Sequence, residues 1–257
     1  MRCKLLAGFI VLTFFAATIC KEIGPPEPGL YDKCLYPVVM LRDKGNVGSG
    51  TAFIVRSEKK GDEYWNIAIT CSHNVTSPDA NYFVKYSKYT NESRFLRYVD
   101  YDCIVYKKTE KRDLAIIAFK SKKKLATTEL NFDPKVNIGL EVIKFGCGLG
   151  GQPRLDEGKI TSRNVSLTAT QRKVYRTSVF TVPGDSGSPI FYKHKVIAVA
   201  EAIRKHQSGF IQYPVYGISL AIPITELKQW NDEIDSIIGF VYDKEQKIPE
   251  DIFEQDK

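Results

Sequence analysis

Short apolar segments rich in Val, Ile, Phe, Tyr and Thr recur along most of the chain, and Gly, Pro, Asn and Asp residues separate them. Segments of this kind, bounded by turn residues, are typical of β-strands. The pattern predicts strands at Val38–Leu41, Thr51–Val55, Trp65–Thr70, Leu114–Phe119, Glu141–Phe145, Tyr175–Val182, Pro189–Tyr192, Val196–Glu201 and Tyr216–Ile222. Strands without intervening helices favour an all-β sandwich or a pair of barrels over alternating βαβ units.

A polar segment from Lys120 to Asp133 divides the expected strands into two groups of similar size. We therefore expect two barrels, over about residues 36–122 and 134–223, joined by a linker that crosses between them. The chain has 257 residues, of which 43% are hydrophobic and 26% charged. This is the balance of a globular protein, so disorder is excluded for most of the chain.

One helix is predicted after the last strand, over residues 225–239. Thr225 is its expected N-cap residue, because it follows a proline and precedes the apolar pattern. The apolar residues that share one helical face are Leu227, Trp230, Ile234, Ile237 and Ile238. A helix with one such face packs on a barrel, so Trp230 is expected in the core. Residues 243–257 are expected to form a polar tail.

The first twenty residues differ from the rest of the chain. Arg2 and Lys4 are basic, and Leu5–Ile19 is almost entirely apolar. This stretch is short for a membrane-spanning helix and typical of a secretory signal peptide. We expect a signal peptide over residues 1–20, followed by an N-terminal segment over residues 21–35. The mature protein is then secreted or periplasmic, without a stable membrane span.

Removal of the signal peptide would leave four cysteines: Cys34, Cys71, Cys103 and Cys147. In an oxidising compartment four thiols suggest two disulfide bonds, with three possible connectivities. No two of these cysteines form a C-x-x-C pair, so no metal site is expected. Lipidation of Cys20 is an alternative to secretion, disfavoured by the bulky isoleucine that precedes it.

The net charge is +7, and much of it lies in two lysine-rich stretches, Lys107–Arg112 and Lys120–Lys124. Such stretches are usually solvated loops. No aromatic residue lies within Lys120–Lys124 to offer a base-stacking surface. A nucleic-acid partner is therefore not expected.

Four segments carry candidate catalytic residues: Gly48–Val55, Ile69–Val75, Arg112–Ile117 and Gly184–Ile190. The second contains a histidine, the third an aspartate and the fourth a serine between glycines. Each lies at the edge of an apolar strand. Any one of them alone is weak evidence, but their order and context together indicate acyl transfer.

A serine hydroxyl becomes a nucleophile when an imidazole takes its proton and a carboxylate orients that imidazole. Ser186 would attack, His73 would act first as general base and then as general acid, and Asp113 would orient His73. Gly184 and Gly187 would allow a tight turn that exposes the hydroxyl. The N–H groups of Gly184 and Ser186 would then donate to the oxyanion, at about 2.7–4 kcal/mol for each donor.

These segments resemble the chymotrypsin-like (trypsin-like) serine proteases in the order His, Asp, Ser, over about residues 36–240. The likeness is greater to bacterial-type branches, the high-temperature-requirement proteases and the glutamyl endopeptidases. The string Gly217–Pro223 followed by a helix is similar to the end of a high-temperature-requirement protease domain. The resemblance implies an all-β fold of two antiparallel six-stranded β-barrels with a C-terminal α-helix, over residues 36–242.

The same resemblance implies a secreted serine endopeptidase that acts on proteins or peptides without a cofactor. The sequence departs from the family in three respects. Cys71 stands two places before His73, whereas animal trypsins have a cysteine immediately after the histidine. An activation sequence is missing, and only Ile23–Gly24 lies where a new amino terminus could pair with Asp185. Too few residues follow Pro223 for a PDZ module, so a monomer is expected.

The resemblance also implies which residues line the substrate pocket, because family members form it from fixed positions relative to the nucleophile. The expected S1 residues are Phe180, Thr181, Glu201, Ala202, Ile203 and Gly217. Phe180, six residues before the nucleophile, would form the bottom of the pocket. Because Phe180 is not acidic, the pocket would not attract a Lys or Arg side chain. Thr181 matches a threonine of glutamyl endopeptidases, but the histidine that they require near Glu201 is missing. We therefore expect an apolar S1 pocket that takes small or medium aliphatic residues.

A catalytically inactive, secreted binding module on the same fold is the alternative function. All three triad residues and both oxyanion positions are present, which favours catalysis. His194 and His206 compete with His73 for the role of base but lack the Thr-x-x-His context. Asp100 and Asp102 compete with Asp113 but lack the Asp-Leu-Ala-Ile context.

Glycosylation sequons begin at Asn74, Asn91 and Asn164. The first adjoins the expected base, where a glycan would obstruct the cleft. The sequence therefore favours a bacterial or viral source, or another compartment without N-glycosylation.

Overall fold

The computed structural model describes residues 29–43, 45, 49–75, 81–167, 172–208, 211–231, 234 and 237, without the side chains of 49, 167, 172 and 202–218. The expected signal peptide, residues 21–28 of the N-terminal segment and the polar tail lie outside these residues. The described residues form the strands β1 (Val38–Asp43), β2 (Ser49–Lys60), β3 (Glu63–Thr70), β4 (Tyr82–Tyr89), β5 (Phe95–Thr109), β6 (Leu114–Ser121), β7 (Glu129–Leu130), β8 (Glu141–Gly146), β9 (Arg154–Leu167), β10 (Arg172–Thr177), β11 (Pro189–Tyr192), β12 (Lys195–Ser208) and β13 (Ile211–Pro223). Short helical turns are η1 (Tyr31–Leu35), η2 (Ser72–Asn74), η3 (Gly148–Gly150) and η4 (Ile224–Trp230).

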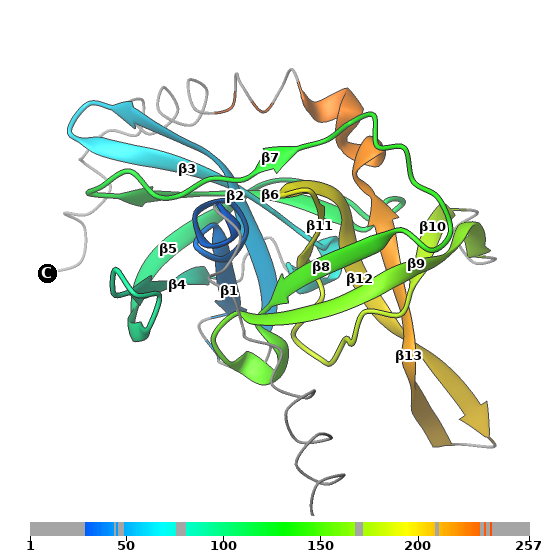
Figure 1. Cartoon of the computed structure of the whole chain (residues 1–257). Coiled ribbons are helices and arrows are strands. Elements are labelled where there is room, and N and C mark those ends of the chain that lie inside the picture. The colour runs from blue at the N-terminus through cyan, green and yellow to red at the C-terminus, as the bar shows by residue number, and fades with distance from the viewer. Residues whose placement is uncertain are drawn as a thin grey trace, which may run out of the picture.

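The first six strands close into a barrel in the order β1-β2-β3-β6-β5-β4 (Figure 1), and every neighbouring pair is antiparallel. Successive side chains of a strand point to opposite faces. All six strands contribute to one buried cluster, which fills the barrel: Val39, Leu41, Ala52, Ile54, Ala68, Val84, Cys103, Ala115, Ile117 and Phe119 belong to it.

The second barrel is formed by β11-β8-β9-β10-β13-β12, and pairing of β11 with β12 closes it. Its neighbouring strands are antiparallel, and two-residue β7 adds a parallel pairing to β12 outside the closed ring. A separate buried cluster, which includes Val142, Ile160, Ile190 and Ala221, fills this barrel. The predicted pair of antiparallel six-stranded barrels is confirmed.

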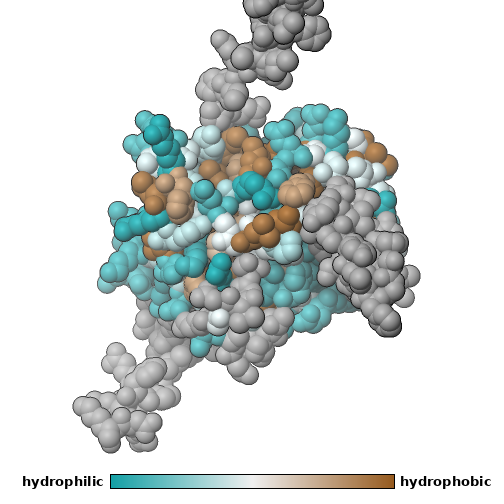
Figure 2. Space-filling model, turned by 90° about the horizontal axis from the view of Figure 1, so that it is seen from below, coloured by the Kyte–Doolittle hydropathy of each residue, from teal (hydrophilic) through white to brown (hydrophobic). Residues whose placement is uncertain are grey.

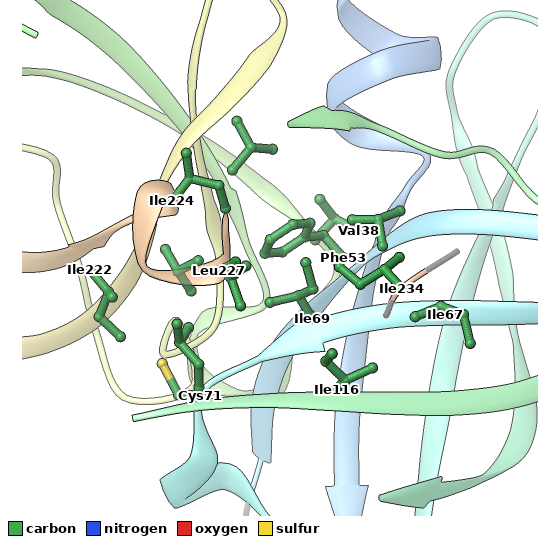
Figure 3. Close-up of a cluster of buried hydrophobic side chains, with 14 of the residues drawn as sticks. Val38, Phe53, Ile67, Ile69, Cys71, Ile116, Ile222, Ile224, Leu227 and Ile234 are labelled. Carbon is green, nitrogen blue, oxygen red and sulfur yellow. The ribbon is translucent and has the colours of Figure 1, made fainter. Parts of the chain in front are cut away.

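A third cluster joins the two barrels. Figure 3 shows Val38, Phe53 and Ile69 of the first barrel facing Ile222 of the second barrel and Leu227 of η4, with Ile116 and Cys71 beside them. These first-barrel residues alternate with those that fill the barrel, so the strands that carry them are buried on both faces. Burial on both faces explains the continuous apolar runs in the sequence.

The helix after β13 begins as a 3-10 turn, η4, and continues at Asn231, Ile234 and Ile237. Its N-cap residue is Pro223, so the prediction that Thr225 caps the helix is wrong. The apolar face packs as predicted: Leu227, Trp230, Ile234 and Ile237 are buried in the cluster between the barrels. Ile238 lies outside the described residues.

Three strands differ most from the prediction. β4, β5 and β9 were not predicted, because much of their length is half-exposed and carries polar and charged side chains. Conversely, the expected strand Tyr175–Val182 ends at Thr177, and the chain then leads into the turn that carries Ser186. Strands in contact with solvent on one face need few apolar residues, so the apolar pattern misses them.

The two expected disulfide bonds are not formed. Cys34, Cys71, Cys103 and Cys147 are all free and buried. Three of them lie in the cluster between the barrels and Cys103 lies in the first barrel, where each packs as a small apolar residue. Burial raises the pKa of the thiols of Cys34, Cys103 and Cys147 to about 12, so they stay protonated.

The surface shown in Figure 2 has small hydrophobic patches set among hydrophilic side chains. In the lysine-rich stretches, Lys108 pairs with Glu110 and Lys122–Lys124 are exposed, as expected for solvated positions. None of the helices within the described ranges is long and apolar enough to cross a membrane.

Candidate active site

His73 and Asp113 meet at the ends of two paired strands. β3 pairs with β6 in the register Thr70↔Ala115, so the turn after β3 and the turn before β6 are neighbours. His73 Nδ1 lies 2.8 Å from Asp113 Oδ2 and 3.0 Å from Asp113 Oδ1. The backbone N–H of His73 also donates to Asp113 Oδ1, at 3.0 Å. Asp113 has φ 54°, the left-handed conformation that aspartate tolerates better than most residues.

The environment keeps Asp113 ionised. Burial by itself would raise the pKa of its carboxyl. Hydrogen bonds from the ring and backbone of His73 and from Ser72 Oγ, together with the charge of His73, lower this pKa by more than burial raises it. The pKa of Asp113 therefore lies below its ordinary value. The side chain of His73 is 45% exposed and that of Asp113 only 12%, so the carboxylate is sheltered while the imidazole is accessible.

Ser186 stands in a tight turn between β10 and β11. Gly184 and Gly187 have φ 95° and 90°, which L-amino acids other than glycine rarely adopt. A Cβ atom on Gly187 would lie 2.0 Å from Thr51 O and 2.6 Å from Thr70 Oγ1. The glycine is therefore required both for its conformation and for the close approach of the first barrel.

The N–H groups of this turn divide into two sets. Those of Asp185, Gly187 and Ser188 donate to Val182 O, Ala200 O and Asp185 O respectively. Those of Gly184 and Ser186 have no acceptor among the described residues. The two donors expected for an oxyanion are thus the two that the fold leaves available.

The Ser186 hydroxyl has a partner in this structure. Its Oγ donates to Glu201 O at 2.6 Å, on the neighbouring strand β12. The hydroxyl proton is therefore directed at a carbonyl of the second barrel in this conformation.

Residues of the first barrel bind the backbone of the turn of residues 182–188, called the nucleophile turn after the role expected of Ser186. Thr51 N and Asn74 Nδ2 donate to Ser186 O at 2.9 and 2.8 Å. Thr51 Oγ1 donates to Gly184 O at 2.8 Å. Asn74 Nδ2 also donates to Thr70 Oγ1 at 3.0 Å. The sequence identifies Asn74 only as part of a sequon, but in the structure its side chain links the histidine segment to the serine.

Asn74 stands immediately after His73 and also fills space against Gly50. A Cβ atom on Gly50 would lie 2.4 Å from Asn74 Cγ. Both hydrogens of the Asn74 amide are used in its two hydrogen bonds, and an attached glycan would replace one of them. The folded protein therefore has no room for a glycan at this sequon.

A buried charge cluster lies behind the nucleophile turn, and sequence analysis missed it. Lys144 of β8 and Asp185 are both fully buried, and Lys144 Nζ lies 2.6 Å from Asp185 Oδ2. Asp156 Oδ2 lies 3.3 Å from the same Nζ, and Arg154 pairs with Asp156. Removing one partner of a buried ion pair lowers the stability of a protein by about 3–5 kcal/mol. The only sequence signal was a lysine inside an apolar strand.

The expected S1 residues are only partly described. Phe180 is 42% exposed, and the Arg154 guanidinium lies 5.4 Å from the centre of its ring. Thr181 and Glu201 are buried. Ala202 and Ile203 lie on β12 and Gly217 on β13, at positions whose side chains are not described.

The competing residues lie elsewhere. His194 is at the tip of the β11–β12 hairpin, as predicted. His206 is paired with Tyr213 within strands β12 and β13, so its expected loop position is wrong. Asp100 and Asp102 are exposed on β5, and Asp100 pairs with Lys85.

One group of three possible metal ligands occurs among the described residues: Cys71, His73 and Asp113, whose ligand atoms lie within 4.8 Å of one another. Cys71 Sγ donates to Ala200 O at 3.3 Å, and His73 and Asp113 bond to each other. Hydrogen bonds therefore account for this group.

The geometry agrees with comparisons to known proteins. The solved structure titled "Crystal structure of Deg5" has a TM-score of 0.60 and 14% sequence identity, over 78% of this chain and 90% of that one. At this identity the likeness shows the fold alone, and 427 matching chains make the fold a poor guide to substrate. No curated protein sequence matches. Residues 50–199 match the family described as trypsin-like peptidase domain, and the chain belongs to this family.

Proposed function

We propose that the chain is a secreted serine endopeptidase that hydrolyses peptide bonds through Ser186, His73 and Asp113 and an acyl-enzyme intermediate. The observation that carries the proposal is the 2.8 Å hydrogen bond from Asn74 Nδ2 to Ser186 O. It holds the residue after His73 against the backbone of the serine. This link between the segment of His73 and the backbone of Ser186 supports the pairing of the two residues as base and nucleophile.

The hydrogen bonds assign a role to each nitrogen of His73. Nδ1 donates to Asp113, so Nε2 is the nitrogen that would take the proton of the Ser186 hydroxyl. The ionised Asp113 stabilises the imidazolium that results, and Nε2 then gives the proton to the leaving amine. The available N–H groups of Gly184 and Ser186 would stabilise the tetrahedral oxyanion.

The bond from Ser186 Oγ to Glu201 O has to break before attack. An extended substrate that binds along β12 would offer its own N–H to this carbonyl, as peptides do when they add to a strand. The hydroxyl would then turn toward His73. In this account the hydroxyl is released when substrate arrives.

The same bond supports the second candidate, a non-catalytic binding module on this fold. In such a module Ser186 would remain bonded to Glu201 O and would add no covalent bond to a ligand. The two candidates differ in whether the hydroxyl is nucleophilic, which can be measured directly.

The deciding experiment is the intact mass of the purified protein after reaction with a fluorophosphonate. A single adduct that is lost in Ser186→Ala and in His73→Ala supports the endopeptidase. Asp100→Asn, a change on the exposed face of β5, should label like the wild type. No adduct on folded wild-type protein, both before and after its amino end is trimmed up to Glu22, would reject the endopeptidase in favour of the binding module.

The S1 pocket is proposed to be apolar. Its support is the exposed ring of Phe180, with the Arg154 guanidinium over it at 5.4 Å, since a cation there disfavours a Lys or Arg side chain. In a panel of fluorogenic peptides, substrates with small or medium aliphatic P1 residues should be cleaved fastest. Cleavage of only Arg or only Glu substrates would contradict this.

Secretion rests on the first twenty residues alone. The four free thiols are buried, so they need neither an oxidising nor a reducing compartment. Amino-terminal sequencing of the protein recovered outside the cytoplasm tests the proposal, and a chain that begins at Met1 and stays inside the cell would contradict it.

A further inference from the structure

Lys144 is a buried cation held by two short hydrogen bonds and an ion pair. Its Nζ atom lies 2.6 Å from Phe180 O, 2.6 Å from Asp185 Oδ2 and 3.3 Å from Asp156 Oδ2. Two of the three ammonium N–H groups donate hydrogen bonds, to Phe180 O and Asp185 Oδ2, and Asp156 adds an ion pair. Both acceptors belong to the segment that carries Ser186, and Asp156, the partner in the ion pair, belongs to β9.

Asp185 connects Lys144 to the nucleophile turn. Its Oδ2 accepts the N–H of Val182 at 2.9 Å, and its backbone N–H donates to Val182 O at 3.0 Å. The carboxylate therefore closes the turn that contains Gly184 and Ser186, the residues with available N–H groups. Its other oxygen, Oδ1, has no hydrogen-bond partner among the described residues. Compensation of the buried charge thus rests mainly on Lys144, with Arg154 3.6 Å away.

The packing leaves no room for the turn to relax. A Cβ atom on Gly146 would lie 2.4 Å from Asp185 Oδ1, and one on Gly148 would lie 2.4 Å from a methyl group of Val182 and 2.9 Å from Asp185 Oδ1. Both glycines follow Lys144 closely in sequence, at the end of β8 and in η3. One short stretch of chain thus supplies both the cation and the close-fitting floor beneath the turn.

We propose that Lys144 is a positioning residue for catalysis: through Asp185 it holds the turn in the shape that presents the N–H groups of Gly184 and Ser186. The proposal rests on the proposed function and deepens it. It also means that the active shape needs no newly freed amino terminus. The place beside Asp185 that such an amino group would take is filled by the Lys144 ammonium.

The test compares wild type with Lys144→Met, which keeps the length of the side chain and removes its charge. Labelling of Ser186 by a fluorophosphonate and hydrolysis of a peptide substrate are measured on each. We expect labelling and kcat to fall at least about 10²-fold while KM changes little, because the loss concerns the oxyanion donors. Ile117→Ala, a core change in the other barrel, should lower Tm without slowing labelling.

Two further preparations keep the test decisive. Lys144→Met combined with Asp185→Asn removes both buried charges, so it can fold where the single variant does not. We expect this double variant to label at least about tenfold more slowly than wild type and no more slowly than folded Lys144→Met. Wild-type protein with a short uncleavable extension at its amino end should label at the normal rate.

The outcomes separate this proposal from the proposed function. If folded Lys144→Met or the folded double variant labels at the wild-type rate, Lys144 is not a positioning residue and the endopeptidase stands. If the unextended wild type labels and the extended protein does not, a free amino terminus sets the turn and the proposal is overturned. If wild type does not label in any form, the proposed function fails and this inference fails with it.

Discussion

The first barrel places His73 and Asp113 at the ends of two directly paired strands, whereas the second barrel places Ser186 in a turn held from behind by buried charges. The histidine and aspartate need little beyond the β3–β6 register to meet. The serine turn depends on Lys144 about forty residues earlier and on Thr51 and Asn74 of the other barrel. The two halves of the site are therefore expected to respond differently to mutation.

The difference follows from what the proposed function requires of each half. His73 needs mobility and access to solvent and substrate, and its side chain is 45% exposed. The turn at Ser186 has to keep two N–H groups unpaired and aimed, which requires rigid support from several sides. Changes near His73 should therefore mainly affect chemistry, and changes around Ser186 should affect both chemistry and stability.

The largest effect is expected in the first barrel, from Asp113→Asn. An amide cannot hold His73 in the required tautomer, so kcat should fall about 10⁴-fold while the fold persists. Hydrolysis of a peptide substrate measures the loss, and Asp100→Asn on β5 serves as the control. A loss below about tenfold would show that Asp113 does not orient His73.

Gly187→Ala tests the second barrel, where we expect a loss of about 3–5 kcal/mol in the free energy of unfolding. Left-handed conformation costs alanine about 1–2 kcal/mol, and the collision with Thr51 O adds the rest. Gly139 is the matched control, because it has φ 88° and open space around its Cβ position. Urea unfolding of both variants separates the two contributions. Equal losses would mean that the barrels can move apart at the site.

Asn74→Ala should show that the two halves are coupled. It removes the hydrogen bonds to Ser186 O and Thr70 Oγ1, so we expect a loss of about 1–3 kcal/mol in stability. Activity should fall about tenfold to 10²-fold, because the serine backbone loses a contact with the histidine segment. Asn91→Ala, at the exposed sequon, should leave both unchanged. An Asn74 variant with normal activity would mean that the halves are positioned independently.

The pH dependence of stability should reveal Asp113. Its pKa is lower in the folded protein than the ordinary value near 3.9 of an unfolded chain. Its contribution to stability is therefore complete at neutral pH, declines from about pH 5 and is lost below the folded pKa. Tm measured from pH 6 to pH 3 should fall less steeply in Asp113→Asn than in wild type. Parallel curves would contradict the lowered pKa.

The smallest effect is expected from a reducing agent. All four described cysteines are free, so dithiothreitol should leave Tm unchanged. The same result is expected in both barrels, and thiol counting under denaturing conditions provides the control. A drop in Tm of several degrees would show a disulfide bond.

The order of histidine, aspartate and serine, the glycines around Ser186 and the alternating apolar strands could be identified locally, because each depends on residues close together in sequence. The two barrels and the buried face of the terminal helix followed from the same patterns. The strands β4, β5 and β9 did not, because a half-exposed strand carries too few apolar residues to stand out. The cysteines were misjudged because pairing depends on position in space, and all four pack in the apolar core.

Tertiary structure alone decided the supports of the site. Lys144 looks in sequence like an ordinary strand lysine, and Asn74 like a glycosylation sequon. Their roles arise because β8 runs behind the nucleophile turn and because the two barrels meet at Ser186. A buried charge or amide is satisfied by partners distant in the chain, and no local pattern encodes which partners the fold will bring to it.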